Sequence, residues 1–133
     1  MIFNKTTKYA FQVVYLIAEK NGKRITAREI CKELNIPYKY LTQILLKLKN
    51  KGLIESISGK RGGYILKNRP SDIYLADIVG LFEDLSELNK CLFHINECCE
   101  DEYPCPLHKY WGAVRDKIRK MLFDVTIEKL LKK

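Results

Sequence analysis

The chain has 133 residues, of which 47% are hydrophobic and 30% are charged. This composition predicts one compact domain, or one domain with an appendage for dimerisation. No apolar run approaches the roughly 18 residues that a membrane span needs, and the N-terminus does not resemble a secretory signal. We therefore expect a cytoplasmic protein with no membrane partner, whose thiols stay reduced.

The net charge of +8 is divided unevenly along the chain. Residues 1–70 carry 15 basic and 4 acidic side chains, net +11, whereas residues 71–133 carry 9 and 12, net −3. General solubility does not require such a division. The basic half is therefore expected to meet a polyanion.

Helical spacing of apolar side chains predicts three helices in the basic half, over residues 5–20, 26–34 and 37–51. Thr26 and Glu29 form a capping-box pattern, in which the hydroxyl accepts the Glu29 amide and the carboxylate reaches back to the Thr26 amide. Pro37 suits the first position of the third helix, because its missing N–H costs nothing there. The third helix is expected to bury four side chains: Leu41, Ile44, Leu45 and Leu48.

The second and third of these helices are joined by a short turn, as in a helix-turn-helix unit. The polar face of the third helix would then be a recognition surface. It carries Tyr38, Lys39, Tyr40, Thr42, Gln43 and Lys47. A helical hairpin with a solvated polar face explains this segment equally well.

The following segment favours the helix-turn-helix interpretation. Residues 53–57 and 64–66 have the pattern of two strands, joined by a glycine-rich turn over residues 58–63. The turn carries Lys60 and Arg61, which would displace counterions from a DNA backbone if the hairpin is the wing of a winged helix-turn-helix. The glycines permit positive φ and let backbone amides approach phosphate.

Cysteine and histidine concentrate in one stretch of the acidic half. Four of the five cysteines and both histidines lie between Cys91 and His108. Thiolates and imidazoles gather where a soft metal is held, so this loop predicts a metal or iron–sulfur site. The fifth cysteine, Cys31, lies among apolar residues on a helical pattern, and we expect it to be buried in the core.

A second helical region follows the cysteine loop. After a short helix expected over residues 75–82, apolar periodicity is weak until Cys105, beyond which apolar side chains recur every seven residues. Such a repeat is typical of a helix that packs on a partner helix, and an ordinary helix packed on its own domain is the alternative. The expected dimer contacts are Trp111, Val114, Ile118, Met121 and Val125.

Several of these motifs together resemble the Rrf-type (IscR/NsrR/CymR-like) family of bacterial winged helix-turn-helix transcription regulators. They are TTKYAF near the start, Pro37-Tyr38-Lys39-Tyr40-Leu41, the segment LKNKGLIESISGKRGGY and the later cysteine loop. The resemblance covers essentially the whole chain. It implies a homodimer that binds a roughly palindromic operator, with iron–sulfur occupancy altering DNA affinity in members that have the cysteines.

The resemblance also implies a ligand set. Three cysteines recur in the family's loop, with five residues between the last two, and Cys99 and Cys105 match that interval. Cys91 would be the first cysteine, although seven residues rather than the family's five separate it from Cys99. Cys98 is the alternative to Cys99. His108 matches the histidine that completes the site in the IscR-like branch.

Two other positions bear on the fourth ligand. In the NsrR-like branch the fourth ligand is an N-terminal Asp of the partner subunit. The matching position here is Lys8, a cation and therefore a poor ligand, so the IscR-like arrangement is favoured. His94 is a rival to His108. A two-iron, two-sulfur cluster is expected, a four-iron, four-sulfur cluster is possible, and zinc would accept the same ligands.

The expected fold is mainly α with a small β-hairpin: a winged helix-turn-helix head and a long C-terminal dimerisation helix. The DNA-binding domain would span residues 1–82, the cysteine-rich sensor loop 83–106, and the dimerisation helix with a terminal turn 107–133. The residues expected on DNA are Arg28, Tyr38, Lys39, Tyr40, Gln43, Lys60 and Arg61.

The expected function is a dimeric transcription regulator, switched by an iron–sulfur cluster that senses iron–sulfur status, redox state or nitric oxide. A zinc-bound or thiol-redox regulator is the alternative, and a small iron–sulfur electron carrier is a further one that would leave the basic half without a role. No Ser/His/Asp set or phosphate-binding glycine loop supports an enzyme, and no small-molecule substrate is expected.

Overall fold

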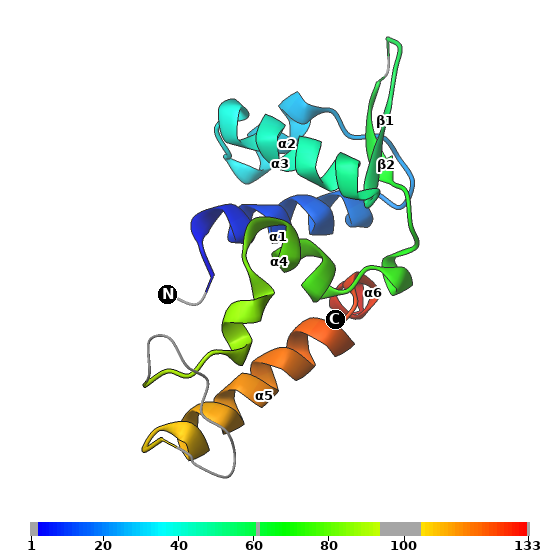
Figure 1. The fold of residues 1–133 in the computed structure, drawn as a ribbon. Coiled ribbons are helices and arrows are strands. Elements are labelled where there is room, and N and C mark those ends of the chain that lie inside the picture. Colours follow the sequence, from blue (N-terminus) through cyan, green and yellow to red (C-terminus); the bar gives the residue numbers. More distant parts are fainter. Residues whose placement is uncertain (1–2, 61, 94–104, 133) are drawn as a thin grey trace.

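The computed structural model describes residues 3–60, 62–93 and 105–132. In these ranges the fold is mainly helical with one two-stranded antiparallel sheet, which confirms the expected fold class (Figure 1). The elements are helices α1 (Lys5–Glu19), α2 (Ala27–Leu34) and α3 (Tyr38–Lys51), strands β1 (Ile54–Ile57) and β2 (Gly63–Leu66), the 3-10 helix η1 (Pro70–Asp72), α4 (Leu75–Phe82), the 3-10 helix η2 (Leu85–Asn89), α5 (His108–Asp124) and α6 (Ile127–Leu131).

The starts of α2 and α3 differ in detail from the expectation. The Thr26 hydroxyl accepts the Glu29 amide at 3.2 Å, as expected, but it also donates to the Glu29 carboxylate at 3.0 Å. The carboxylate therefore bonds the hydroxyl and not the Thr26 backbone amide. Pro37 immediately precedes α3 instead of opening it, and its carbonyl accepts the Leu41 amide at 3.1 Å.

A single hydrophobic core joins the N-terminal and C-terminal elements around α1, which packs against α4, α6 and β2. Its fully buried members include Ala10, Val13, Ile30, Leu41, Leu48, Ile73, Ile78 and Ile127. All four side chains expected inside α3 are buried. Cys31 is an exception to the expectation, because it is only half-buried and packs against the edge of this core.

The wing is more than a two-stranded hairpin, because Ile25 pairs with strand β2. Tyr64 donates its amide to the Ile25 carbonyl at 2.8 Å, and Ile25 donates back at 3.3 Å. Two glycines of the turn allow this packing. A Cβ on Gly63, whose φ is +158°, would lie 2.8 Å from the Ile25 oxygen, and one on Gly62 would lie 2.6 Å from the Ile57 oxygen. These glycines therefore provide room for backbone contacts within the wing.

We expect Gly63→Ala to lower the free energy of unfolding by about 2–3 kcal/mol, because the added Cβ would push the Ile25 carbonyl off β2. Gly22→Ala is the matched control, since Gly22 also has positive φ, +88°, but has nothing within 4 Å of an added Cβ. It should cost only about 1 kcal/mol. Urea unfolding measures both. Equal losses of stability in the two variants would show that the close approach of Gly63 to the Ile25 carbonyl does not affect stability.

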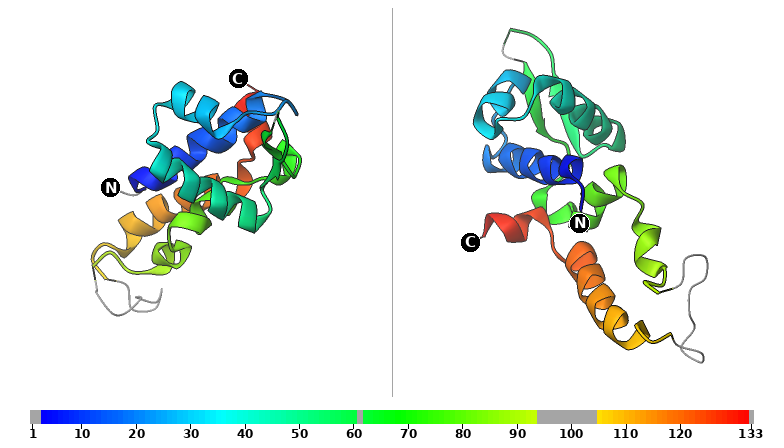
Figure 2. Two further views of the ribbon diagram at one scale, coloured as in Figure 1. Left: turned by 90° about the horizontal axis from the view of Figure 1, so that it is seen from above. Right: turned by 90° about the vertical axis from the view of Figure 1, so that its left-hand side faces the viewer.

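The C-terminal segment folds back on the body, as expected for its terminal turn. Leu75 donates its amide to the Val125 carbonyl at 3.1 Å, and Ile127 donates to the Ile73 carbonyl at 2.9 Å. From this anchor α5 runs away from the wing, so the wing and the start of α5 lie at opposite ends of the molecule (Figure 2). Among the described residues no helix is both long and apolar enough to cross a bilayer.

Candidate functional site

The outer face of α3 presents the residues expected to read DNA. Tyr38 and Tyr40 are 60% and 53% exposed, and Lys39 and Gln43 are also exposed. They stand out because Leu41 and its buried neighbours turn the opposite face of α3 inward. An exposed pair of aromatic side chains can pack against sugars and base edges, and the cation between them can pair with phosphate.

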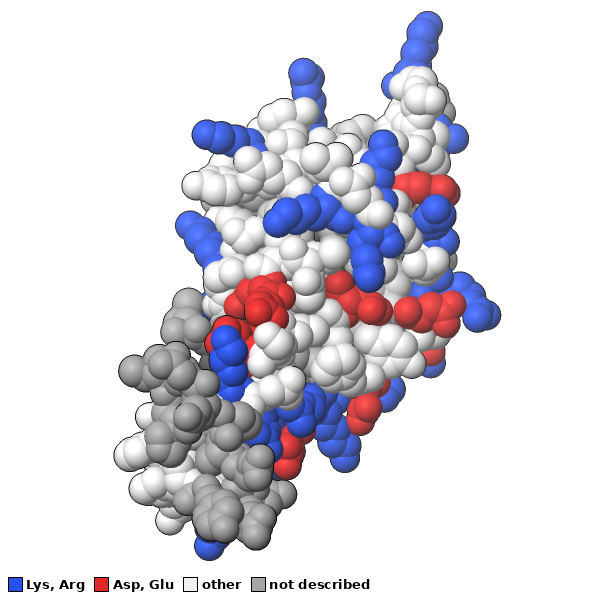
Figure 3. Space-filling view, in the orientation of Figure 1, with Lys and Arg blue, Asp and Glu red and all other residues white. Residues whose placement is uncertain are grey.

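Other cations of the head surround this face. Arg28, in the first turn of α2, and Lys60, in the wing turn, are exposed, whereas Arg61 lies outside the described residues. Figure 3 shows Lys and Arg over the part of the surface formed by α2, α3 and the wing, and Asp and Glu in a band below. Lys and Arg therefore predominate around α2, α3 and the wing, whereas both signs of charge are mixed below the acidic band.

One expected member of the α3 polar face has a different partner. The Lys47 ammonium lies 5.3 Å from the centre of the Phe82 ring, at the end of α4. The residue after Phe82, Glu83, accepts a hydrogen bond from the hydroxyl of the fully buried Thr7 in α1. The end of α4 is thus tied both to the recognition helix and to α1.

The structure brings two of the four expected metal ligands into contact. The Cys91 and Cys105 sulfurs lie 3.4 Å apart, and no disulfide joins them. Cys105 is buried, and its carbonyl accepts the amide of His108, the first residue of α5, at 3.1 Å. His108 is half-buried. Cys98, Cys99 and His94 lie outside the described residues.

The segment before Cys91 is fastened to α5 by side chains of that helix. The Trp111 indole N–H donates to the Lys90 carbonyl at 3.0 Å, and the Arg119 guanidinium donates to the Asn89 side-chain oxygen. This part of the loop is the 3-10 helix η2, a regular element that the weak apolar periodicity did not predict. Trp111, expected only as a dimer contact, therefore also holds the backbone next to Cys91.

Local hydrogen bonds hold η2 in shape. The hydroxyl and the amide of Ser86 both donate to the Asp84 carboxylate, at 2.6 and 2.9 Å, and they lower the pKa of Asp84. At the other end Lys90 donates to the Glu87 carboxylate at 2.8 Å, and this bond raises the pKa of Lys90. Both groups are therefore charged near neutral pH, and they hold the chain as it enters the cysteine site.

The apolar repeat of α5 is divided between two environments. Leu122 is buried, and Ile118 and Val125 pack partly against the core. Val114 and Met121 are 48% and 40% exposed, and Tyr110 on the same face is 69% exposed. Tyr110, Val114 and Met121 form an apolar stripe on the outer face of α5, because spacings of four and seven residues return to one side of a helix.

The two thiols fit a metal or cluster as part of its ligand set. Two thiolates on one tetrahedral ion, with bonds of about 2.3 Å, lie about 3.8 Å apart, close to the separation observed. Within residues 3–60, 62–93 and 105–132 no three His, Cys, Asp or Glu side chains gather as a metal would require. A third ligand would therefore have to come from the loop residues outside these ranges or from a repositioned His108 side chain.

The similarity of this chain to known proteins extends over nearly its whole length. The sequence model of the Rrf2 family, described as iron-dependent transcriptional regulators, matches residues 3–133. The chain belongs to the Rrf2 family. The HTH-type transcriptional regulator CymR of Bacillus subtilis is 31% identical over 92% of this chain and 84% of its own length. IscR of Vibrio atlanticus is 28% identical over 94% and 72%, respectively.

A solved structure agrees with this Rrf2 assignment. That of CymR, described as the global cysteine regulator of B. subtilis, has a TM-score of 0.81 and 28% identity to this chain, covering 98% of this chain and 95% of CymR. Rrf2 members are DNA-binding transcription regulators, so this chain is not an enzyme. Relatives of the IscR type and of the CymR type match similarly well, and the branch has to be inferred from the cysteine site.

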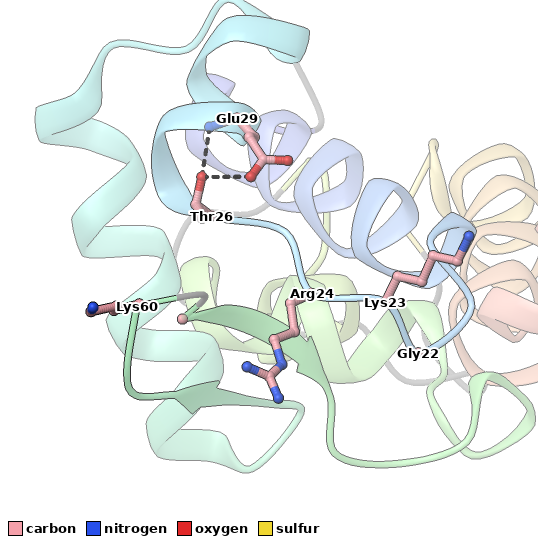
Figure 4. A pocket seen from close by; sticks show the side chains of 7 residues that line it. Gly22, Lys23, Arg24, Thr26, Glu29 and Lys60 are labelled. Atoms are coloured by element: carbon pink, nitrogen blue, oxygen red, sulfur yellow. Dashed lines mark hydrogen bonds between the residues drawn. The ribbon is translucent and has the colours of Figure 1, made fainter.

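No motif in the sequence marks the two basic residues Lys23 and Arg24. They line a groove of about 630 Å³ together with Gly22, Thr26, Glu29, Lys60 and Gly62 (Figure 4). The two cations are adjacent and directly precede Ile25, but the pairing of Ile25 with β2 has no signature in the sequence. Only the fold shows that they belong to the wing.

Proposed function

We propose that this Rrf2 protein is a homodimeric regulator whose affinity for a palindromic operator is set by an iron–sulfur cluster at the cysteine site. The observation that carries the proposal is the approach of the Cys91 and Cys105 sulfurs to 3.4 Å across 14 residues of chain. In this scheme residues 1–82 bind DNA, 83–106 sense the signal and 107–133 hold the dimer together.

The ligands would be three thiolates and one imidazole. Cys91 and Cys105 supply two thiolates, Cys99 is proposed as the third with Cys98 as its alternative, and His108 is proposed as the fourth ligand. This set corresponds to the IscR-like arrangement, and it suits a two-iron, two-sulfur cluster, because histidine replaces cysteine in some clusters of that type. When bound, the cluster supplies a centre whose integrity responds to iron supply, redox state or nitric oxide.

The geometry of the head supports a specific set of contacts with the operator. The exposed face of α3 would enter the major groove, with Tyr38, Lys39, Tyr40 and Gln43 near base edges and flanking phosphates. Arg28 would lie near the backbone, and Lys60 and Arg61 in the wing would reach the minor-groove side.

A physical route joins the two ends of the molecule. The Asn89 side chain and the Lys90 carbonyl next to Cys91 accept hydrogen bonds from α5, Glu83 accepts one from Thr7 in α1, and Phe82 contacts Lys47 on the recognition helix. Binding of a cluster next to Cys91 can therefore bias the position of α3 through the short stretch 82–91. Such a population shift needs a few kcal/mol of difference between two head arrangements.

We expect cluster-loaded and apo protein to differ in operator affinity by at least about tenfold, equivalent to 1.4 kcal/mol. Anaerobic purification, visible absorption and metal content first establish whether the bound species contains iron and sulfide or zinc. Operator titrations of both forms are then made at one salt concentration, because affinity depends steeply on salt. Equal affinities would reject the sensor role and leave DNA binding intact.

The sulfur contact also favours a second candidate, a thiol-redox regulator. Hydrogen peroxide would take two electrons and two protons from the Cys91 and Cys105 thiols, forming one disulfide while its O–O bond breaks to give two water molecules. Reduction by a dithiol would reverse the step. If protein without metal forms this disulfide reversibly and loses or gains operator affinity with it, the redox candidate replaces the cluster.

A further inference from the structure

We propose that the groove between the α1–α2 connection and the wing is a second contact surface for the DNA sugar-phosphate backbone. It would extend the grip of the head beyond the recognition helix and the wing tip. The inference rests on the DNA-binding function proposed above and assigns it two new residues, Lys23 and Arg24, in the strand-like connection before Ile25.

The position of the groove follows from the order of elements across the wing. Helix α3 packs against β1, β1 pairs with β2, and β2 pairs on its other side with Ile25 through the two backbone hydrogen bonds to Tyr64. Residues 23 and 24 therefore lie beyond β2, at the edge of the wing away from β1. A duplex engaged by α3 and the wing tip would bring a backbone strand toward this edge.

The charges that line the groove suit an anion. Lys23, Arg24 and Lys60 contribute three cations, whereas Glu29 is the one carboxylate among the described lining residues, and it accepts the Thr26 hydroxyl at 3.0 Å. Lys23, Arg24 and Lys60 are all exposed. Phosphates that replace counterions at such cations gain affinity without any contact to a base.

The directions of the side chains favour a long polyanion over a single small anion. Figure 4 shows that Lys23, Arg24 and Lys60 point in different directions and that Arg24 lies alongside the strands of the wing. Three cations spread in this way cannot close around one phosphate. They can each meet a different phosphate of a backbone that runs along the groove, so duplex DNA is the occupant that fits.

The test compares wild-type dimer with the double variant Lys23→Gln, Arg24→Gln on a mixed-sequence duplex. Phosphate contacts carry no sequence information, so the operator need not be known. Affinity is measured over a range of salt concentrations. The slope of log K against log salt is expected to become shallower by about 0.9 for each lost contact, hence by about two for each engaged head.

A matched double variant, Lys109→Gln with Lys120→Gln, removes the same charge from exposed positions on α5. It should leave the slope close to that of wild type. If the groove variant keeps the wild-type slope, or if both variants lose the same amount, the groove makes no direct contact and the inference is wrong. A wild-type dimer without salt-dependent affinity for duplex would instead overturn the DNA-binding function, and the groove contact with it.

Discussion

Replacement of Cys105 by serine is expected to abolish cluster binding. Cys105 is the buried member of the sulfur pair, and a serine hydroxyl is neither as soft nor as acidic as a thiol, so it replaces a thiolate ligand poorly. Visible absorption and the iron and sulfide content of anaerobically purified protein should fall by at least about tenfold. The affinity of the variant for the operator should then equal that of apo wild-type protein.

Cys31→Ser is the matched control for this experiment. Cys31 is a free, half-buried thiol on α2, in the DNA-binding head and not in the cysteine segment. The Cys31→Ser protein should still bind the cluster, because the substitution exchanges one half-buried sulfur outside the cysteine site for oxygen. If the Cys105→Ser protein retains the visible absorption of wild type, Cys105 is not a cluster ligand. The contact between the Cys91 and Cys105 sulfurs would then no longer support the proposed sensor.

Val114→Glu on the exposed stripe of α5 is expected to dissociate the dimer. In a two-fold symmetric interface each substitution occurs twice, so two carboxylates would be buried without partners. We expect the dissociation constant of the dimer to rise by at least about 100-fold. Operator affinity should fall by a similar factor, because two linked heads bind far more tightly than one.

Phe123→Glu provides a control of the same chemistry on the other side of the helix. Phe123 is 52% exposed, close to the 48% of Val114, but it lies half a turn away from the stripe. Sedimentation over a range of protein concentrations measures both variants. If Val114→Glu remains dimeric, or if Phe123→Glu dissociates the protein equally, the stripe of Tyr110, Val114 and Met121 is not the interface.

Much of the head could be predicted because its signals are local. The four apolar side chains of α3 and the turn between the two strands each act within a few residues of chain. The Rrf2 resemblance was likewise carried by contiguous motifs. The geometry of Thr26 and Glu29 was less well predicted, because one carboxylate can accept a hydrogen bond from either a hydroxyl or an amide.

One contact of the cysteine site was expected from the sequence, and its surroundings were not. Clustering of thiols and imidazoles in sequence pointed to Cys91 and Cys105, and the structure brings their sulfurs together. The contacts of Trp111 and Arg119 with the backbone and side chain before Cys91 were not foreseen. They join residues 21 and 30 positions apart, and no periodic pattern encodes such a distance.

The amino-acid order alone determined the main helices and both strands, the basic and acidic halves, and the concentration of sulfur near one end of α5. These properties depend on short-range sterics, on side-chain periodicity and on composition. Only the tertiary structure decided that Ile25 joins the wing and carries Lys23 and Arg24 with it, that one side of the α5 repeat is buried while Val114 stays exposed, and that the sulfur pair lies far from the wing. Each of these depends on packing between distant segments, where burial of apolar surface and backbone pairing select one arrangement among many that the same local patterns allow.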